Sequence, residues 1–591
     1  MKTFSVNILN IKQRRIRQLL LFVFFMATYS SSYADYVKNE PITLTQPNGV
    51  EINVFVSGDE YYSWIHDKDG YTIIQNPTTG YYCYALLQED ELMASPYIVG
   101  QTDPKSTKLE PNVRISNKQI QEKRLMFFNN TPVTAPKSSK GNAFGTLNNI
   151  VIYIRFANQT EFSAEQNKYT SMFNSETGNS MKNFFKEISY GQMNIQSHFY
   201  PTNNGSIIVS YQDSHNREYY CPYSYYNTSG YKEDERADRE HTLLYNAIEA
   251  VKSQIPTSLN LDYDNNGQVD NVCFIIRGMY NPNTLLWSHR WSLYSKFVQI
   301  NGKRVYDYNV QIEERLNSGG VGTLCHEMGH TFGAPDLYHG EQDSYPIEKW
   351  DLMSNNLNPP QYTGAYIRHK YMGWITTIPT ISKPGTYTLH PLSSSSNNCY
   401  KIPLKNSSEY LVLEYRKKEG TFENQIYGSG LVVYRINETH SGNHGATGHG
   451  GINDEVYIFR PGGSVSSNGT ISKAHFSSSV KRTSFNASTN PACFISDGSG
   501  RNVFIWNIKE NTDGTLSFKF SYCGDDDDKF FSNTRNLPAY TKVSSSIQTE
   551  GNVVVKSSDN VTFEAAEGVS LGEGFEVEEG GTFNVIIYDC D

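Results

Sequence analysis

Two histidines four residues apart, His326 and His330, constrain this chain more than any other feature of its sequence. Residues i and i+4 share one face of an α-helix, so both imidazoles reach one metal ion if this segment is helical. Glu327 follows the first histidine directly. Catalytic zinc takes three protein ligands and a water molecule, whose proton a nearby carboxylate accepts. The segment therefore predicts a helix with two zinc ligands and with Glu327 as general base.

The residues that follow the second histidine supply a third ligand. Gly333 can adopt positive φ and end the helix, and Pro335 prevents the helix from resuming. The turn then directs Asp336 back toward the metal. Met353 lies seventeen residues beyond Asp336, in the segment WDLMS, and predicts a methionine turn beneath the zinc site. HExxH alone also occurs on solvated helices, but burying these groups together without a metal would be costly, so the complete pattern favours zinc.

The first 34 residues have the composition of a signal peptide. They carry five basic side chains, the apolar run from Leu19 to Ala27, and the small-residue site Ser32-Tyr33-Ala34. No stretch of the chain is apolar over the length that a transmembrane helix needs. The whole chain has a net charge of −10, and loss of this +5 segment leaves −15, which disfavours a nucleic acid partner. We expect a secreted or cell-surface protein without a transmembrane segment that begins near Asp35.

Changes of pattern along the 591 residues predict several domains, since one hydrophobic core rarely supports so long a chain. Short strand-like runs come first, then a Pro- and Ser-rich linker, then alternating strands and helices from Ile150, and strands again after Thr376. The fold class is therefore α+β. The expected divisions are a signal peptide (1–34), a β-rich segment with its linker (35–142), a catalytic segment (143–375), a second β-rich segment (376–524), and a linker with a small β-module (525–591).

The motif resembles the HExxHxxGxPD signature of the immune inhibitor A family of metallopeptidases, here from His326 to Asp336. The similarity extends from Ile150 through Trp287-Ser288-His289 to Gly373-Trp374 and the segment EYLVLEYRKKEG. The resemblance implies a secreted endopeptidase made as a proenzyme, with a metzincin-like zincin catalytic domain that contains an active-site helix and a Met-turn. It also implies that His326, His330 and Asp336 bind zinc, that Glu327 is the general base, and that residues 35 to 130 form the propeptide.

The last segment, from about Ser545, is similar to stacked-strand modules at the ends of exported proteins of Bacteroidetes bacteria. This similarity implies association with the bacterial cell envelope.

A second metal site is predicted at Asp262, Asp264, Asn266 and Asp270. Oxygen-bearing side chains at alternate positions around Gly267 copy the first half of a calcium loop. Cys273 stands where an EF-hand places its bidentate glutamate, so calcium would need other ligands. The pattern favours structural calcium, and a metal-free Asx-rich turn is the alternative.

Several other polar residues near these motifs have two interpretations. Tyr338 could donate a hydrogen bond to the developing oxyanion, although packing beneath the site is the more common role of such a phenol. His289 and Cys325 are expected to be structural. The remaining candidates are a second metal site at His440, His444 and His449, against a surface loop, and a latency ligand among Cys83, Asp59, Asp67 and Asp69, against turn or core residues.

The expected function is zinc-dependent hydrolysis of peptide bonds in protein or peptide substrates. The alternative is a non-catalytic cell-surface adhesin or carbohydrate-binding protein on a protease scaffold, which the β-rich, aromatic C-terminal third would suit. Such a protein would have no need for a general base, so the presence of Glu327 beside all three ligands favours the enzyme.

Overall fold

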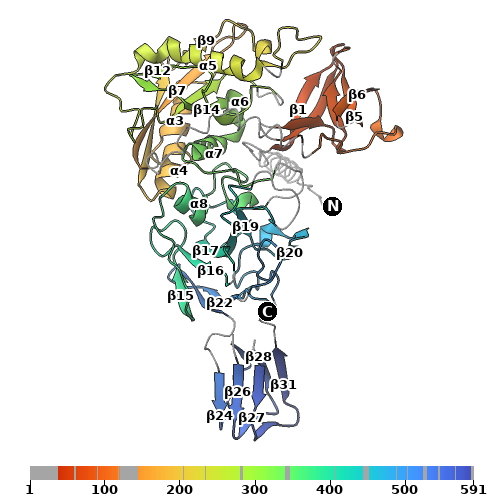
Figure 1. Cartoon of the computed structure of the whole chain (residues 1–591), viewed down its shortest axis with the longest axis vertical. Coiled ribbons are helices and arrows are strands. Elements are labelled where there is room, and N and C mark those ends of the chain that lie inside the picture. Colours follow the sequence, from red (N-terminus) through yellow and green to blue (C-terminus); the bar gives the residue numbers. More distant parts are fainter. Residues whose placement is uncertain are drawn as a thin grey trace, which may run out of the picture.

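A computed structural model describes most of the chain after the predicted signal peptide. The described residues are 37–58, 62–76, 78–88, 91–116, 119, 144–203, 205–232, 235–279, 284–339, 346–405, 407–443, 451–487, 489–501, 503–522, 529–543, 546–565 and 568–587. The signal peptide, the linker at 131–142 and the acidic run at 525–528 lie outside them. Helices and many strands are both present (Figure 1), which confirms the α+β class.

The N-terminal segment forms one antiparallel sheet of six strands in sequence order. Its hydrophobic core contains Ile52, Val54, Ile73 and Tyr84. Figure 1 draws this sheet in red at the upper right. The strands are β1 (Val37–Thr45), β2 (Glu51–Gly58), β3 (Ser63–His66), β4 (Thr72–Gln75), β5 (Tyr82–Gln88) and β6 (Glu91–Ile98).

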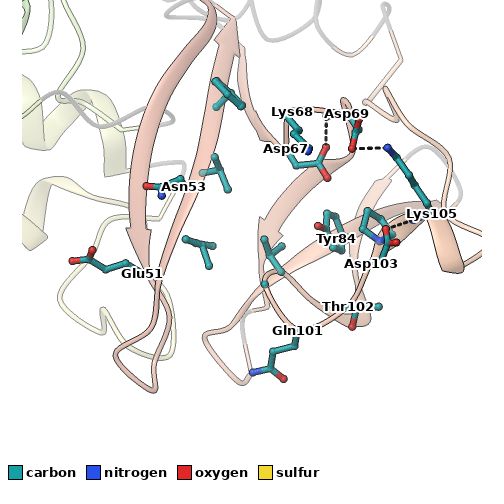
Figure 2. Close-up of a pocket in the computed structure, with 16 residues that line it drawn as sticks. Glu51, Asn53, Asp67, Lys68, Asp69, Tyr84, Gln101, Thr102, Asp103 and Lys105 are labelled. Carbon is teal, nitrogen blue, oxygen red and sulfur yellow. Dashed lines mark hydrogen bonds and ion pairs between the residues drawn. The ribbon is translucent and has the colours of Figure 1, made fainter. Parts of the chain in front are cut away.

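An open concavity of about 880 Å³ lies on this sheet, lined by residues 51–55, 67–69, 84 and 99–105 (Figure 2). Carboxylates and ammonium groups both border it, and Asp69 Oδ2 lies 2.9 Å from Lys105 Nζ. Its lining shares no residue with the predicted zinc motif.

The central segment is built around a sheet of strand order β11-β14-β10-β7-β8, with β9 paired to β7. All described pairings in it are parallel except that of β11 with β14. Its elements are β7 (Gly145–Arg155), α3 (Gln166–Asn174), α4 (Met181–Ile188), β8 (Met193–Tyr200), β9 (Tyr211–Gln212), α5 (Arg236–Val251), β10 (Val272–Ile276), β11 (His289–Ser292), β12 (Gln299–Ile300), β13 (Lys303–Arg304), β14 (Asp307–Ile312), α6 (Glu313–Gly319), α7 (Val321–Thr331) and α8 (Ala365–Lys370).

Side-chain alternation along β7 explains why helices cover both faces of this sheet. Val151 and Tyr153 pack with α3, α4 and α7, whereas Ile152 and Ile154 pack with α5 on the other face. A strand buried on both faces is typical of a parallel sheet with helices on each side. The apolar residues of α4 and α5, which recur at helical spacing, are buried against these two faces.

The second β-rich segment forms two sheets around a shared core. One sheet contains β16 (Cys399–Pro403), β17 (Tyr410–Arg416), β18 (Gly430–Ile436) and β19 (Val456–Ile458); the other contains β15 (Gly385–Leu389), β22 (Val503–Glu510) and β23 (Leu516–Tyr522). A hairpin joins β20 (Gly463–Ser464) to β21 (Ser467–Asn468). The outer face of the first sheet belongs to the hydrophobic cluster that also contains α7, because Val412, Val432 and Ile458 share this cluster with Leu324 and Met328; α8 contacts β17 directly.

The terminal module consists of short parallel strands stacked in successive coils around a small apolar core, at the lower end of Figure 1. The strands are β24 (Lys529–Ser532), β25 (Tyr540–Val543), β26 (Ser546–Glu550), β27 (Val553–Val555), β28 (Asn560–Ala565), β29 (Gly568–Leu571), β30 (Phe575–Val577) and β31 (Thr582–Ile587). In the described part of the chain, no helix is both long and apolar enough to cross a membrane.

Candidate metal centre

The helix α7 carries the two predicted histidine ligands, and its glycines allow neighbouring segments to approach it closely. A Cβ on Gly322 would lie 2.2 Å from Leu357 O, and one on Gly329 would lie 2.8 Å from Met353 Sδ. Gly333 has φ 88° and ends the helix as predicted, with its N–H donating to His330 O. The chain can therefore turn back toward the helix immediately after its last residue.

This turn brings three potential ligand atoms together. His326 Nε2 and His330 Nε2 are 3.0 Å apart, and Asp336 Oδ1 lies 3.2 Å from the first and 3.3 Å from the second. Tetrahedral zinc with bonds of about 2.0–2.1 Å separates its ligands by roughly 3.3 Å. The two nitrogens and one oxygen thus fit a zinc ion, and the structure brings together all three residues that the sequence predicted.

Backbone carbonyls set the orientation of both imidazoles. His326 Nδ1 lies 3.0 Å from Leu352 O, and His330 Nδ1 lies 2.7 Å from Ala334 O. A carbonyl oxygen only accepts hydrogen bonds, so each Nδ1 donates, and each Nε2 is left to bind a metal.

Burial makes this arrangement sensitive to charge. Burial and the neighbouring His330 lower the pKa of His326 to about 3. Burial also acts to lower the pKa of His330, but the Asp336 carboxylate outweighs it and raises that pKa to about 9. One positive charge is thus favoured between the two rings and the carboxylate, and a bound cation would supply it.

A tight turn at Met353 lies directly beneath the helix. Ser354 N donates to Asp351 O, Met353 N donates to Asp351 Oδ1, and Leu337 N donates to Met353 O. The Met353 sulfur is the atom closest to the position that a Cβ on Gly329 would occupy. The turn therefore contacts both α7 and the loop that carries Asp336.

The two remaining residues of the predicted centre are also buried here. Glu327 lies in α7, next to His326, and is 1% exposed. Tyr338 is 1% exposed and packs against Trp64 of β3, so the N-terminal sheet reaches the loop that carries Asp336. This contact fits the packing alternative for Tyr338, and its oxyanion role stays a prediction.

The acidic loop before β10 gathers three of its four predicted ligands. Single oxygens of Asp262, Asp264 and Asp270 lie within 4.8 Å of one another, and Asn266 Nδ2 donates to Asp264 Oδ2. Lys303 Nζ lies 2.6 Å from Asp262 Oδ2. Burial, with the nearby Asp264 and Asp262, raises the pKa of Asp270 to about 7. Both calcium and a metal-free turn remain compatible with this geometry.

The other candidates occupy structural positions where the structure describes them. His289 binds Glu240 and Trp287 O, and Cys325 lies in the apolar core, so both structural expectations are confirmed. Cys83 is buried in β5, while Asp67 and Asp69 lie in the turn between β3 and β4. Asp59, His444 and His449 lie outside the described residues.

The sequence analysis did not predict the residues from other parts of the chain that contact the Asp336 loop and its neighbour His339. Asn443 N donates to Asp336 O, and His339 Nε2 lies 2.5 Å from Asp454 Oδ1. These partners are more than a hundred residues apart, and no local pattern joins them. The backbone carbonyls of Leu352 and Ala334, which accept from the two histidines, were also not predicted, because every residue type carries a backbone carbonyl.

Comparison with known proteins gives the same family as the motif. Residues 278–366 match the model of the catalytic domain of immune inhibitor A peptidase M6. The chain is also 28% identical over 146 residues to "Immune inhibitor A" of Bacillus thuringiensis subsp. alesti. That alignment covers 18% of this chain and 20% of the relative, so the chain spans about a fifth of its curated relative's length. The predicted resemblance to the immune inhibitor A family is thereby confirmed.

Proposed function

Because the chain is related to the immune inhibitor A peptidases, we propose that it is a zinc-dependent endopeptidase that hydrolyses peptide bonds in proteins. The observation that carries this proposal is the convergence of His326, His330 and Asp336 within 3.3 Å. Their nitrogen and oxygen donors suit zinc. When bound, zinc polarises the scissile carbonyl and lowers the pKa of the attacking water.

Glu327 performs the proton transfers in this proposal. Its carboxylate takes a proton from the attacking water, holds it, and passes it to the leaving amine. The neighbouring His326 and His330 keep their Nδ1 protons on backbone carbonyls, so Glu327 is the base available on this helix. Helix, glycine turn and Met353 together support a metzincin-like zincin with a Met-turn.

The edge strand β11 is a suitable place for the substrate. It pairs with β14 alone among the described strands and packs beside α7. An extended peptide can add to such an edge through main-chain hydrogen bonds, whatever its sequence.

The test uses Glu327→Gln in protein from which residues 1–142 have been removed. We expect zinc content to persist, because no ligand changes, and casein cleavage to fall by about 10²–10⁴-fold. Glu249→Gln on α5 removes a comparable carboxylate away from the site and is the control. Cleavage by Glu327→Gln at the unmodified rate would show the assignment to be wrong; zinc-free, inactive unmodified protein would favour a binding module.

The proposal includes synthesis as a secreted proenzyme. Three contacts of the N-terminal sheet with the catalytic segment support it: Trp64 with Tyr338, Val56 with the α5-side core, and Gly80 with Tyr226, whose ring would lie 1.5 Å from a Cβ on Gly80. Proteolysis in the predicted linker at 131–142 would release this sheet.

Latency can be tested in the full chain without residues 1–34. Trp64→Ala should raise its casein cleavage several-fold, because the contact with Tyr338 is lost. Trp506→Ala, in β22, is the control for loss of a tryptophan. Equal, low activity of both variants together with full activity after linker cleavage would place the inhibitory contact elsewhere on the sheet. N-terminal sequencing of the exported protein should begin near Asp35.

Two further parts of the proposal concern calcium and location. Calcium at Asp262, Asp264, Asn266 and Asp270 would stabilise the loop before β10 by replacing Lys303 as the balancing charge. The terminal module would retain the bacterial protein at the cell envelope. Cell fractionation with and without residues 525–591 tests this location.

A further inference from the structure

The loop that carries Asp336 belongs to neither a helix nor a strand. It starts at Gly333, and Leu337 N donates to Met353 O on one side of it. The helix therefore fixes the positions of both histidines but not that of the carboxylate. Since a functional site tolerates displacements of only about 0.5 Å, something else must hold this loop.

Asn443, which follows β18, contacts the opposite side of the loop. Its N–H donates to Asp336 O over 2.9 Å, and its Nδ2 donates to Leu337 O over 3.3 Å. The same amide bonds to both backbone groups of Val456 in β19, over 2.8 and 3.0 Å. The residue is fully buried. Its side chain thus clamps the metal-binding loop to the edge of the β16–β19 sheet.

Asparagine is suited to this position because it needs a donor and an acceptor on one short side chain. Nδ2 donates to two carbonyls, while Oδ1 accepts from Val456 N. Aspartate would keep the acceptor and lose both donations. Alanine would leave buried backbone groups without these partners, which is costly.

A second contact that holds this part of the chain begins at His339, three residues after Asp336. His339 Nε2 is 2.5 Å from Asp454 Oδ1, and both side chains are buried. Asp454 lies two residues before Val456, the first residue of β19, so both clamps connect the loop to the start of one strand. Arg416 adds a related contact from β17, donating to Trp350 O just before the Met353 turn.

We propose that Asn443, with the His339–Asp454 pair, is a positioning residue for the third metal ligand, and that the β16–β19 sheet is thereby a working part of the metal centre. The inference rests on the proposed function, because it assumes that Asp336 binds zinc. Beyond the proposed function, Asn443 and Asp454, more than a hundred positions after Asp336, are inferred to set the zinc affinity and the ligand geometry of the site.

The experiment measures zinc affinity of the chain lacking residues 1–34 by competition with a chromophoric chelator. Asn443→Ala should weaken zinc binding about 10–100-fold, as loss of supporting hydrogen bonds does at other zinc sites. Asn398→Ala is the matched control, because Asn398 is a buried asparagine that bonds to Tyr190 and Ser394 instead. The control should bind zinc within about twofold of the unmodified chain.

The visible spectrum of the cobalt-substituted protein separates positioning from general loss of stability. Asn443→Ala should shift its d–d bands, which depend on ligand geometry, and Asn398→Ala should leave them unchanged. Asp454→Asn keeps an acceptor for His339 and should behave as unmodified protein, whereas Asp454→Ala should weaken zinc binding about tenfold. If Asn443→Ala does not fold, the comparison of Asp454→Asn with Asp454→Ala tests the inference instead.

Unchanged zinc affinity and cobalt spectrum in folded Asn443→Ala, or in folded Asp454→Ala, would overturn the inference. Failure of the unmodified chain to bind zinc would instead contradict the proposed function. Weakened zinc binding in Asn443→Ala, with Asn398→Ala unaffected, would support both.

Discussion

Two clusters of potential ligands lie in the central segment, and they are built differently. In one, His326, His330 and Asp336 approach within 3.3 Å, and each imidazole has its other nitrogen on a backbone carbonyl. In the other, Asp262, Asp264 and Asp270 gather within 4.8 Å, but the loop's own N–H groups and Lys303 already use Asp262.

This difference shows what turns nearby ligands into a metal centre. In the cluster of His326, His330 and Asp336, backbone carbonyls orient both imidazoles so that the ligand atoms face one another, as in metal sites whose histidines are held by a second shell of hydrogen bonds. The acidic cluster satisfies many of its charges locally and can persist without an ion. The first is therefore expected to depend on metal for activity, and the second at most for stability.

The largest expected effect is loss of cleavage when zinc is removed. A chelator should reduce casein hydrolysis by more than about 10³-fold, because the attacking water loses its activation, and added zinc should restore it. Asp270→Asn should respond in the same way. Chelator-sensitive activity that only calcium restores would reverse the roles of the two clusters.

Gly329→Ala tests how closely the first cluster is supported. Its Cβ would lie 2.8 Å from Met353 Sδ, so the buried Met353 side chain must shift in a packed site, at a cost of about 1–3 kcal/mol. Chemical unfolding should detect this loss, together with weaker zinc binding. Gly568→Ala, where nothing lies within 4 Å of the new Cβ, should change neither quantity.

Lys303→Met tests whether the acidic loop prefers calcium to its lysine. Loss of the competing ammonium should strengthen calcium binding roughly fivefold, measured by calorimetry. Without calcium, the variant should unfold at a lower temperature, because three carboxylates lose their balancing charge. A variant that is indifferent to calcium would identify the loop as a metal-free turn.

The smallest effect concerns His241, a buried histidine in α5 without any predicted metal. Its Nδ1 lies 2.7 Å from Ser295 Oγ, and burial lowers its pKa to about 4 even though Glu240 and Asp238 oppose the shift. The unfolded chain takes up a proton below about pH 6.5, so the contribution of His241 to stability is lost as pH falls from 6.5 to 4.

His241→Phe should make stability less dependent on pH. Between pH 6.5 and pH 4, the thermal midpoint of the variant should fall by about 1–2 °C less than that of the unmodified protein. His390→Phe, on a partly exposed loop, is the control. An unchanged pH profile in His241→Phe would mean that other groups cause the acid sensitivity.

Local pattern was enough to predict the elements that carry the first cluster. The apolar run Val272–Ile276 forms β10, beside the strand that begins the predicted alternation of strands and helices, and Gly333 ends α7 as predicted from its conformational freedom. Both depend on residues within one turn or strand. The alternation of β7 between two cores likewise follows from its sequence period.

The supporting contacts could not be predicted, because they join distant segments. Asn443 meets Asp336, and Trp64 meets Tyr338, through tertiary packing that no periodicity records. In the sequence, Asn443 cannot be distinguished from a surface asparagine in a glycine-rich loop. Its role becomes visible only when the positions of β18 and β19 in the fold are known. The domain boundaries also stay predictions, although the core that surrounds α7 includes Val412 and Ile458 from beyond residue 375.

That shared core has a consequence for biosynthesis. The chain emerges from the ribosome N-terminus first, and Ile458 appears long after α7. During that interval the N-terminal sheet, made entirely of earlier residues, can already fold and meet Tyr338. In the proposed proenzyme, the last side chains of the core around α7 would therefore be synthesised after the sheet that is proposed to cover the site, so a nascent chain would have no stage with a complete and uncovered site.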